Sequence, residues 1–189
     1  MAGKSTFIKS LNINCLCSQV LNTAFAKYYH APIWQLMTSM TIKDNLSHKS
    51  SYYMEEVSSI GDLISSSEDN NKLYLFTIDE IFKGTNTIER ISTAKAILEY
   101  LNRNKHLVLV STHDIELTKL LKSGFDLYFF QESIVDESLS FDYKIKKGIL
   151  ERSNAISILE LSGYPKEITD SARVLASKLR IEKTGHNKL

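Results

Sequence analysis

The sequence predicts an α/β fold, in which a mostly parallel sheet is flanked by helices. Two short apolar runs, Leu73–Ile78 and Leu107–Val110, are separated by a helical pattern over Ile88–Leu101. Two strands joined by a helix of this length are typical of the βαβ arrangement, whose parallel sheet is covered on both faces. Ligands bind at the carboxyl ends of such strands. The polar residues that follow the two apolar runs are therefore the first candidates for a functional site.

A long helix is predicted after Ser5. Its apolar residues recur at three- and four-residue spacings, as they do in a helix that packs under a sheet. They are Phe7, Ile8, Leu11, Cys15, Leu16 and Val20. Ile33–Met40 follows as a short strand or a loop. A second helix is predicted by the apolar residues Met54, Val57, Ile60 and Ile64.

The second half of the chain predicts an antiparallel margin and a helical extension. Phe125–Phe130 and Leu139–Ile145 have strand patterns, and the second alternates as an edge strand does. Asn154–Leu161 is a predicted helix that Gly163 ends, and Pro165 opens a last helix with one apolar stripe. Both helices are candidates for packing on a partner.

Composition indicates a soluble globular chain with one sizeable core. The 189 residues are 43% hydrophobic and 24% charged, and the net charge of +1 leaves no overall electrostatic footprint for nucleic acid. Cys15 and Cys17 are too close for a typical disulfide and lack the partners of a zinc site, so we expect packing thiols in a reducing compartment. No apolar stretch approaches the ~18 residues of a membrane helix. A cytoplasmic protein without membrane contact is expected.

The first residues contain the second half of a phosphate-binding loop. Gly3-Lys4-Ser5 precedes the predicted helix, as in the pattern Gly-x-x-x-x-Gly-Lys-Ser/Thr. In that loop, backbone N–H groups and a helix N-terminus bind phosphates. The Lys neutralises phosphate charge, and the Ser or Thr hydroxyl binds Mg²⁺. The first glycine of the pattern would fall before residue 1. The tripeptide alone is also compatible with an ordinary exposed terminus.

Three polar residues follow the two apolar runs of the sheet. Asp79 and Glu80 end the first run, and His113 comes shortly after the second. Adjacent acids at a strand end are how nucleotide hydrolases hold Mg²⁺ and a water. A lone histidine after a strand also fits a structural role. Three polar groups at equivalent ends of neighbouring strands favour a shared site.

The segment around Ser50 has two interpretations. Ser50 and Ser51 stand where helix N-caps stand, so the periodicity alone favours a capped helix with a serine-rich start. The alternative is a signature segment whose hydroxyls and helix N-terminus face a nucleotide that another subunit binds.

Taken together, the motifs resemble the C-terminal ATPase domain of the MutS family of DNA mismatch repair proteins, over nearly the whole chain. Five motifs carry this resemblance, in the same order as in the family. They are Met1-Ala2-Gly3-Lys4-Ser5-Thr6; Asp44-Asn45-Leu46 with Ser50-Ser51-Tyr52 and Glu55; Asp79-Glu80-Ile81 with Gly84-Thr85-Asn86-Thr87; Thr112-His113 with Glu116-Leu117-Thr118; and Gly163-Tyr164-Pro165-Lys166-Glu167. The resemblance implies a P-loop NTPase fold of the ABC-ATPase type with a C-terminal helical extension.

The resemblance also implies a role for each matching residue in binding and hydrolysing ATP with Mg²⁺. The ATP-binding residues are Met1, Ala2, Gly3, Lys4, Ser5 and Thr6. Ser5 ligates Mg²⁺ directly and Asp79 holds it through water, Glu80 polarises the attacking water, and His113 senses the γ-phosphate. The remaining residues act across a homodimer with composite ATP sites: Ser50 contacts the nucleotide of the opposite subunit, and Gly84, Thr85, Asn86 and Thr87 form an interface turn. Turnover drives a clamp on DNA, which is contacted through domains that this chain lacks.

By this resemblance, residues 1–150 are the ATPase core and 151–180 are a C-terminal helical dimerisation segment. The last residues, 181–189, are polar and are expected to form a disordered tail. Phe82-Lys83 replaces the family's Gly-Arg, and Asp114-Ile115 replaces its Tyr-Phe, which indicates a divergent branch. Since the first glycine and the strand before the loop are absent, we expect an N-terminally truncated chain. Hydrolysis is then expected in the intact parent protein and impaired in this chain.

Two alternatives remain at the level of the sequence. The chain could be a non-enzymatic remnant that binds nucleotide weakly, because half of the phosphate cradle is missing. It could also be another ABC-type head, as Leu46-Ser47 suggests, but the Gly-Gly that usually follows is absent.

Overall fold

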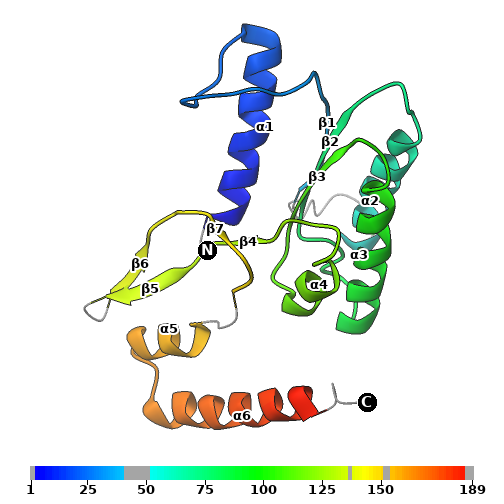
Figure 1. The fold of residues 1–189 in the computed structure, drawn as a ribbon. Coiled ribbons are helices and arrows are strands. Elements are labelled where there is room, and N and C mark those ends of the chain that lie inside the picture. The colour runs from blue at the N-terminus through cyan, green and yellow to red at the C-terminus, as the bar shows by residue number, and fades with distance from the viewer. Residues whose placement is uncertain (1–2, 41–51, 136–137, 151–153, 186–189) are drawn as a thin grey trace. The chain divides into compact units, whose positions relative to one another are not determined.

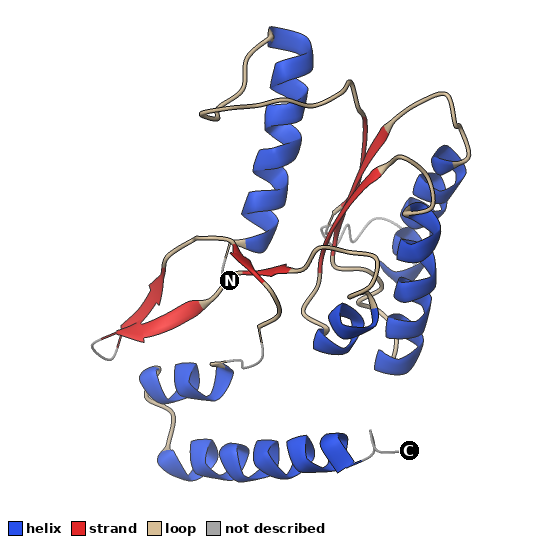
Figure 2. Ribbon diagram, in the orientation of Figure 1, coloured by secondary structure: helices blue, strands red, loops and turns tan. Residues whose placement is uncertain are grey.

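A three-stranded parallel sheet forms the centre of the first of two structural units. The computed structural model describes residues 3–40, 52–135, 138–150 and 154–185 (Figures 1 and 2). The first unit comprises Gly3–Phe129 and Lys147–Ile149, and the second comprises Phe130–Lys146 and the chain from Leu150. This division differs from the predicted boundary at residue 150. The segment Phe130–Lys146, which lies in the sequence between the two stretches of the first unit, belongs to the second unit.

The sheet has the strand order β1-β2-β3, with β1 at Gln35–Ser39, β2 at Tyr74–Asp79 and β3 at Leu107–Ser111. Both pairings are parallel. The predicted βαβ arrangement is confirmed, because α3 (Thr87–Leu101) connects β2 to β3. The register places Asp79 beside Ser111, so the two strands end at the same level.

Helices cover both faces of this sheet. Helix α1 (Lys4–Leu21) contacts β2 and β3, while α2 (Tyr52–Ser67) contacts β1 and α3, and α3 contacts the short α4 (Ile115–Leu120). In Figure 1, α1 lies on one side of the sheet, and α2 and α3 lie on the other. The fold is therefore the α/β arrangement with a helix-flanked parallel sheet that the sequence predicts.

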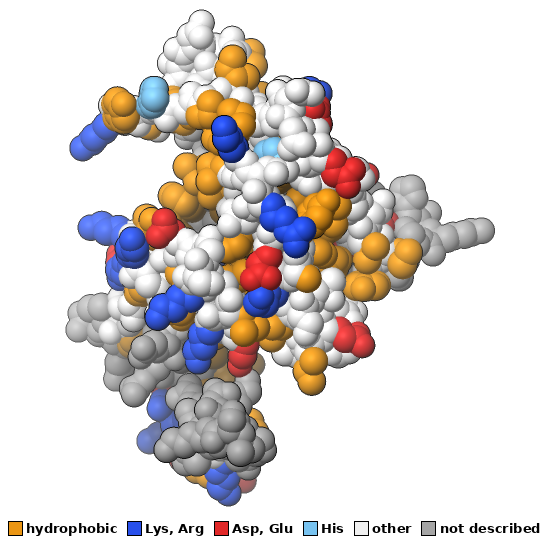
Figure 3. All heavy atoms as spheres, turned by 45° about the vertical axis from the view of Figure 1, so that its right-hand side comes forward, with side chains coloured by type: hydrophobic (Ala, Val, Ile, Leu, Met, Phe, Trp, Pro, Cys, Tyr) orange, Lys and Arg blue, Asp and Glu red, His pale blue; other side chains and the backbone are white. Residues whose placement is uncertain are grey.

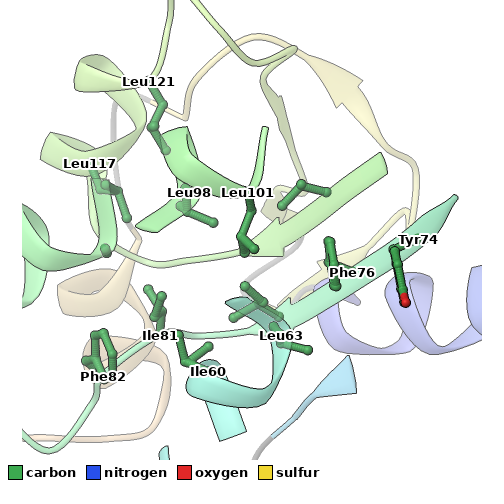
Figure 4. Packing of buried hydrophobic residues seen from close by; sticks show 13 residues of the cluster. Ile60, Leu63, Tyr74, Phe76, Ile81, Phe82, Leu98, Leu101, Leu117 and Leu121 are labelled. Carbon is green, nitrogen blue, oxygen red and sulfur yellow. The ribbon is translucent and has the colours of Figure 1, made fainter. Parts of the chain in front are cut away.

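The main core lies between β2 and the helices α2, α3 and α4 (Figure 4). Because side chains alternate along a strand, Tyr74, Phe76 and Ile78 share the face that joins this core. Thr77 has the opposite orientation and donates its hydroxyl to Asn12 Oδ1 of α1 at 2.9 Å. All six residues of β2 are buried. This strand is thus held on both sides, which fixes the position of its carboxyl end.

The apolar stripe predicted for α1 is buried only in part. Ile8 and Cys15 are buried, whereas Leu16 and Val20 are exposed, which corrects the prediction for the last turns. A helix of 18 residues is roughly 27 Å long, longer than the roughly 17 to 20 Å of a five- or six-residue strand. The end of α1 therefore extends beyond the sheet. Apolar side chains gather at this end of the unit (Figure 3).

The second unit contains a hairpin and two helices. Strands β5 (Glu132–Val135) and β6 (Ser138–Phe141) pair in antiparallel fashion, and they precede α5 (Ala155–Leu161) and α6 (Lys166–Gly185). Glu160 of α5 accepts a hydrogen bond at Oε1 from Arg173 Nε of α6, at 2.9 Å. Helix α6 continues to Gly185, past the predicted start of a disordered tail at residue 181.

The strands predicted before α5 have different bounds in the structure. Within Phe125–Phe130 only β4 (Tyr128–Phe129) is extended, and β7 (Lys146–Lys147) pairs with it. The predicted strand Leu139–Ile145 is wrong beyond Phe141, where β6 ends. Tyr143 has a φ of 50°, a left-handed conformation that a strand does not accommodate. Across the described segments, none of the helices combines the length and apolar composition that a membrane crossing requires.

Candidate functional site

Asp79 is the centre of a cluster at the carboxyl ends of β2 and β3. Ser5 Oγ, in the first turn of α1, donates to Asp79 Oδ1 at 3.0 Å, and Ser111 Oγ donates to the same oxygen. Asp79 is buried. The parallel register explains the contact with Ser111, and the packing of α1 under the sheet explains the contact with Ser5. Three separate elements thus converge on one carboxylate.

Gly3 and Lys4 lie at the start of α1 beside this cluster. Gly3 has a φ of 97°, which an L-residue rarely adopts, and its carbonyl accepts the Phe7 N–H at 2.9 Å. The Lys4 ammonium donates to the Thr112 carbonyl at 3.0 Å. The helix N-terminus and the lysine are therefore both at the end of β3. A helix N-terminus with exposed N–H groups favours an anion.

Glu80 lies next to Asp79 and faces two nitrogen groups. Its Oε2 is 2.9 Å from Lys83 Nζ and 3.3 Å from His113 Nδ1. The Glu80 N–H donates to the Ser111 carbonyl at 3.0 Å, which holds its backbone against β3. Glu80 has a φ of 63°, an uncommon value for a non-glycine residue. Strained backbone of this kind is concentrated at functional sites.

The turn after Glu80 is built into the core and onto α2. Ile81 and Phe82 are buried, and the Phe82 ring lies 5.8 Å from the Tyr53 ring. A Cβ on Gly84 would meet Tyr53 Cβ at 3.1 Å, so this close approach favours glycine. The predicted interface turn is exposed at Gly84, Asn86 and Thr87 and half-buried at Thr85.

Asn86 ends this turn and begins α3. Its side chain accepts the Glu89 N–H at 3.0 Å, which satisfies one of the unpaired N–H groups at the helix start. Thr85 Oγ1 donates to Glu89 Oε2 at 3.3 Å. The Gly-Thr-Asn-Thr sequence therefore also stabilises the start of α3.

An ion pair connects this turn to the segment after β3. Arg90 Nε donates to Asp114 Oδ2 at 2.9 Å and Arg90 Nη2 to Asp114 Oδ1 at 2.8 Å. Arg90 Nη1 also donates to the Thr85 carbonyl at 3.4 Å. Asp114 stands at the N-cap position of α4, but its carboxylate bonds Arg90 instead of capping the helix. The turn Gly84–Thr87 and the residue after His113 are thus joined by one guanidinium.

We expect this pair to make stability depend on acid pH. The hydrogen bonds from Arg90 lower the pKa of Asp114, and the nearby His113 adds a smaller effect in the same direction. Since the folded pKa lies below the unfolded value of about 3.9, the stabilisation is complete above about pH 4 and is lost as pH falls through the folded pKa. Denaturant unfolding from pH 7 downward should show the stability difference between wild type and Asp114→Asn shrinking below about pH 4. A constant difference would contradict this expectation.

The oxygen donors at the cluster fit Mg²⁺ bound together with phosphates. Ser5 and Asp79 supply a hydroxyl and a carboxylate 3.0 Å apart. Within the described residues, no group of three His, Cys, Asp or Glu side chains could hold a metal by itself. Mg²⁺ is commonly held by one or two protein oxygens, waters and substrate phosphates. A site of two protein donors is consistent with that mode of binding.

The structure brings together five of the predicted site residues. Lys4, Ser5, Asp79, Glu80 and His113 converge at the strand ends, whereas Thr6 is exposed on α1. Met1, Ala2 and Ser50 lie outside the described residues.

Four residues at or near the site were not predicted as part of it: Glu56, Lys83, Arg90 and Ser111. Ser111 could have been found by aligning the ends of β2 and β3. Arg90 and Glu56 carry no local sequence signal, because their partners are distant in the chain.

A helix-flanked parallel sheet with this cluster at its strand ends is a P-loop ATPase-type fold. The family model for MutS domain V matches residues 1–180. The chain therefore belongs to the MutS domain V family, which is the ATPase domain of MutS.

Relatives with the name DNA mismatch repair protein MutS extend this finding. The chain is 30% identical to the protein of Finegoldia magna over 188 residues, covering 97% of this chain and 22% of the relative. It is 32% identical to the proteins of Listeria welshimeri and Halalkalibacterium halodurans over 187 residues, covering 96% and 97% of this chain and 21% of each relative. The chain thus spans about a fifth of the length of these relatives.

Proposed function

We propose that this chain is the part of a longer MutS-like protein of a divergent branch that binds ATP and, within that protein, hydrolyses it. The observation that carries the proposal is the convergence of Lys4, Ser5, Asp79, Glu80 and His113 at one edge of a parallel sheet. These residue types supply phosphate charge neutralisation, oxygen donors for Mg²⁺ and a base for water.

The first turn of α1 receives the phosphates of ATP. Its backbone N–H groups and the Lys4 ammonium neutralise charge on the β- and γ-phosphates. Ser5 ligates Mg²⁺ and Asp79 holds it through water. When bound, Mg²⁺ would offset the negative charge that develops on the phosphate oxygens during transfer. The buried position of Asp79 and its bonds to Ser5 and Ser111 keep the carboxylate in one orientation.

Glu80 acts on the attacking water. Its carboxylate accepts a proton as the water oxygen bonds to the γ-phosphorus, and the bond from that phosphorus to the β,γ-bridging oxygen breaks. The products are ADP and inorganic phosphate. His113 lies on the neighbouring strand end, 3.3 Å from Glu80 Oε2, where it can donate to the γ-phosphate and sense its presence.

Two copies of the chain complete each other's ATP sites. Ser50 contacts the nucleotide of the opposite subunit, and the turn Gly84–Thr87 carries signals across the interface. The exposure of this turn and its attachment to Asp114 through Arg90 support that role. ATP then closes the dimer, and loss of the γ-phosphate opens it. The C-terminal helical segment contributes further dimer contacts.

The cycle drives a clamp on DNA in mismatch repair or related DNA processing. The relatives whose name includes mismatch repair support this assignment. Because the net charge of the chain is only +1, DNA contact is assigned to other regions of the longer protein. The working location of such a protein is the cytoplasm.

Turnover of ATP by the full-length protein and its Glu80→Gln variant tests this proposal. The variant keeps the size of the side chain but cannot accept a proton, so we expect the rate to fall on the order of 10²-fold or more. Glu99→Gln, on the exposed part of α3, is the matched control and should retain the wild-type rate. Equal turnover of wild type and Glu80→Gln would remove Glu80 from the mechanism.

A further inference from the structure

Lys83 forms the closest contact to the side chain of Glu80 among the charged residues around it. The Lys83 ammonium is 2.9 Å from Glu80 Oε2, and His113 Nδ1 is 3.3 Å from the same oxygen. The side chains of Lys83 and Glu80 are 33% and 26% exposed, against 76% and 75% for the surface pair Lys147–Asp126. Partial burial reduces screening by water, so the contact at Glu80 is the better ordered of the two pairs.

The backbone of Lys83 is held independently of this ion pair. Its N–H donates to Glu56 Oε1 of α2 at 3.2 Å, and Glu56 is buried. The preceding Phe82 is buried, has a φ of 55° and contacts the Tyr53 ring. Left-handed conformations at both Glu80 and Phe82 turn the chain so that Lys83 returns to Glu80. Lys83 is therefore aimed at Glu80 by packed neighbours.

Orientation of a carboxylate determines how well it serves as a base. An unrestrained glutamate has several rotatable bonds, and a proton acceptor works only within hydrogen-bond reach of its water. Both nitrogen contacts fall on Oε2. They restrain the position of Oε2, so that Oε1 can accept a proton from the attacking water.

We propose that Lys83 is a positioning residue for Glu80 in ATP hydrolysis. This inference rests on the proposed ATPase function, which it deepens. Lys83 acts through Glu80: it holds Oε2, so that Oε1 faces the water that attacks the γ-phosphate. The Lys83–Glu56 bond also connects this carboxylate to α2, whose start follows the segment that contains Ser50.

Steady-state ATP turnover of Lys83→Met and Lys83→Arg tests the inference. Lys83→Met removes the charge but keeps much of the side-chain volume, and we expect kcat to fall roughly 10-fold because one charge-assisted hydrogen bond in a partly exposed site is lost. The KM for ATP should change by less than about twofold, since Lys83 acts on the base. Lys83→Arg keeps a cation within reach of Oε2 and should restore kcat to within about threefold of wild type.

Two controls separate positioning from a general effect of losing a lysine. Lys95→Met removes the lysine of the α3 pair Lys95–Glu99 and should leave kcat and KM unchanged. In a Glu80→Gln background, Lys83→Met should produce no further loss of kcat. A kcat for Lys83→Met within about twofold of wild type, or an equal loss in Lys83→Arg, would overturn the proposal.

Absence of turnover in the full-length wild-type protein would instead refute the ATPase function. The contact between Lys83 and Glu80 is then tested by a double-mutant cycle, in which Tm is measured for the wild type, Glu80→Gln, Lys83→Met and the double variant. A paired arrangement predicts that the two losses in Tm overlap by about 1 to 3 °C. Fully additive losses would show that the two side chains are not coupled, and would reject the inference.

Discussion

Replacing Arg90 with alanine is expected to lower the free energy of unfolding by about 3 to 5 kcal/mol. The side chains of Arg90 and Asp114 are only 13% and 8% exposed, and two hydrogen bonds of 2.9 and 2.8 Å join them. Removing the guanidinium leaves the Asp114 carboxylate buried without its charged partner. The cost of that unpaired charge exceeds the small net gain of forming such a pair.

Denaturant unfolding of the wild type and a small set of variants measures this effect. Lys95→Ala removes one partner of an exposed pair and should cost no more than about 1 kcal/mol. Replacing both Arg90 and Asp114 with leucine should cost less than Arg90→Ala alone, because no unpaired charge then remains. If Arg90→Ala unfolds at the same denaturant concentration as Lys95→Ala, the Arg90–Asp114 pair does not stabilise the fold by the amount that its burial indicates.

The same pair has a consequence for the site. Arg90 holds the Thr85 carbonyl on one side and Asp114, the neighbour of His113, on the other. The Asp114 N–H in turn donates to Thr112 Oγ1 at 3.0 Å. Loss of Arg90 would therefore loosen the turn Gly84–Thr87 and the segment after β3 together. Its two hydrogen bonds to Arg90 give Asp114 a structural role at this position.

Local periodicity was sufficient to predict the centre of the fold. The strand ending at Asp79, the helix after the Gly-Thr-Asn-Thr turn and the strand before His113 are all found, because each is a short element with a clear apolar pattern. Parallel order then places Asp79, Glu80 and His113 at one edge. The candidate site follows from these two steps without knowledge of side-chain contacts.

The sequence could not predict features that depend on distant partners or on backbone conformation. The pairing of Arg90 with Asp114 and that of Glu56 with Lys83 join residues far apart in the chain. The strand predicted through residue 145 ends early because Tyr143 turns left-handed, although its alternation continues to Ile145. For α1, periodicity predicts an apolar face but not how far the sheet beneath it extends.

Phe76→Ala is the second variant with a large expected effect, again a loss of about 3 to 5 kcal/mol in the free energy of unfolding. Phe76 is fully buried at the centre of β2. Its ring stacks on Tyr74 at 5.3 Å between centroids and meets the edge of the His106 ring at 5.4 Å. The alanine would leave a cavity beneath α2 and α3, which the rigid sheet cannot close.

Phe25→Ala is the matched control, because this phenylalanine is 78% exposed. Its replacement should change the free energy of unfolding by no more than about 0.5 kcal/mol. Phe76→Leu fills part of the cavity and should lose less than the alanine variant. Since β2 ends in Asp79 and Glu80, a partly destabilised Phe76→Leu protein should also show whether strand packing sets the geometry of the site. If stability falls while turnover of the folded fraction is kept, the bonds at Asp79 and Glu80 hold the site without help from the strand core. A parallel fall in both would show that the buried strand is itself part of how the two acids are positioned.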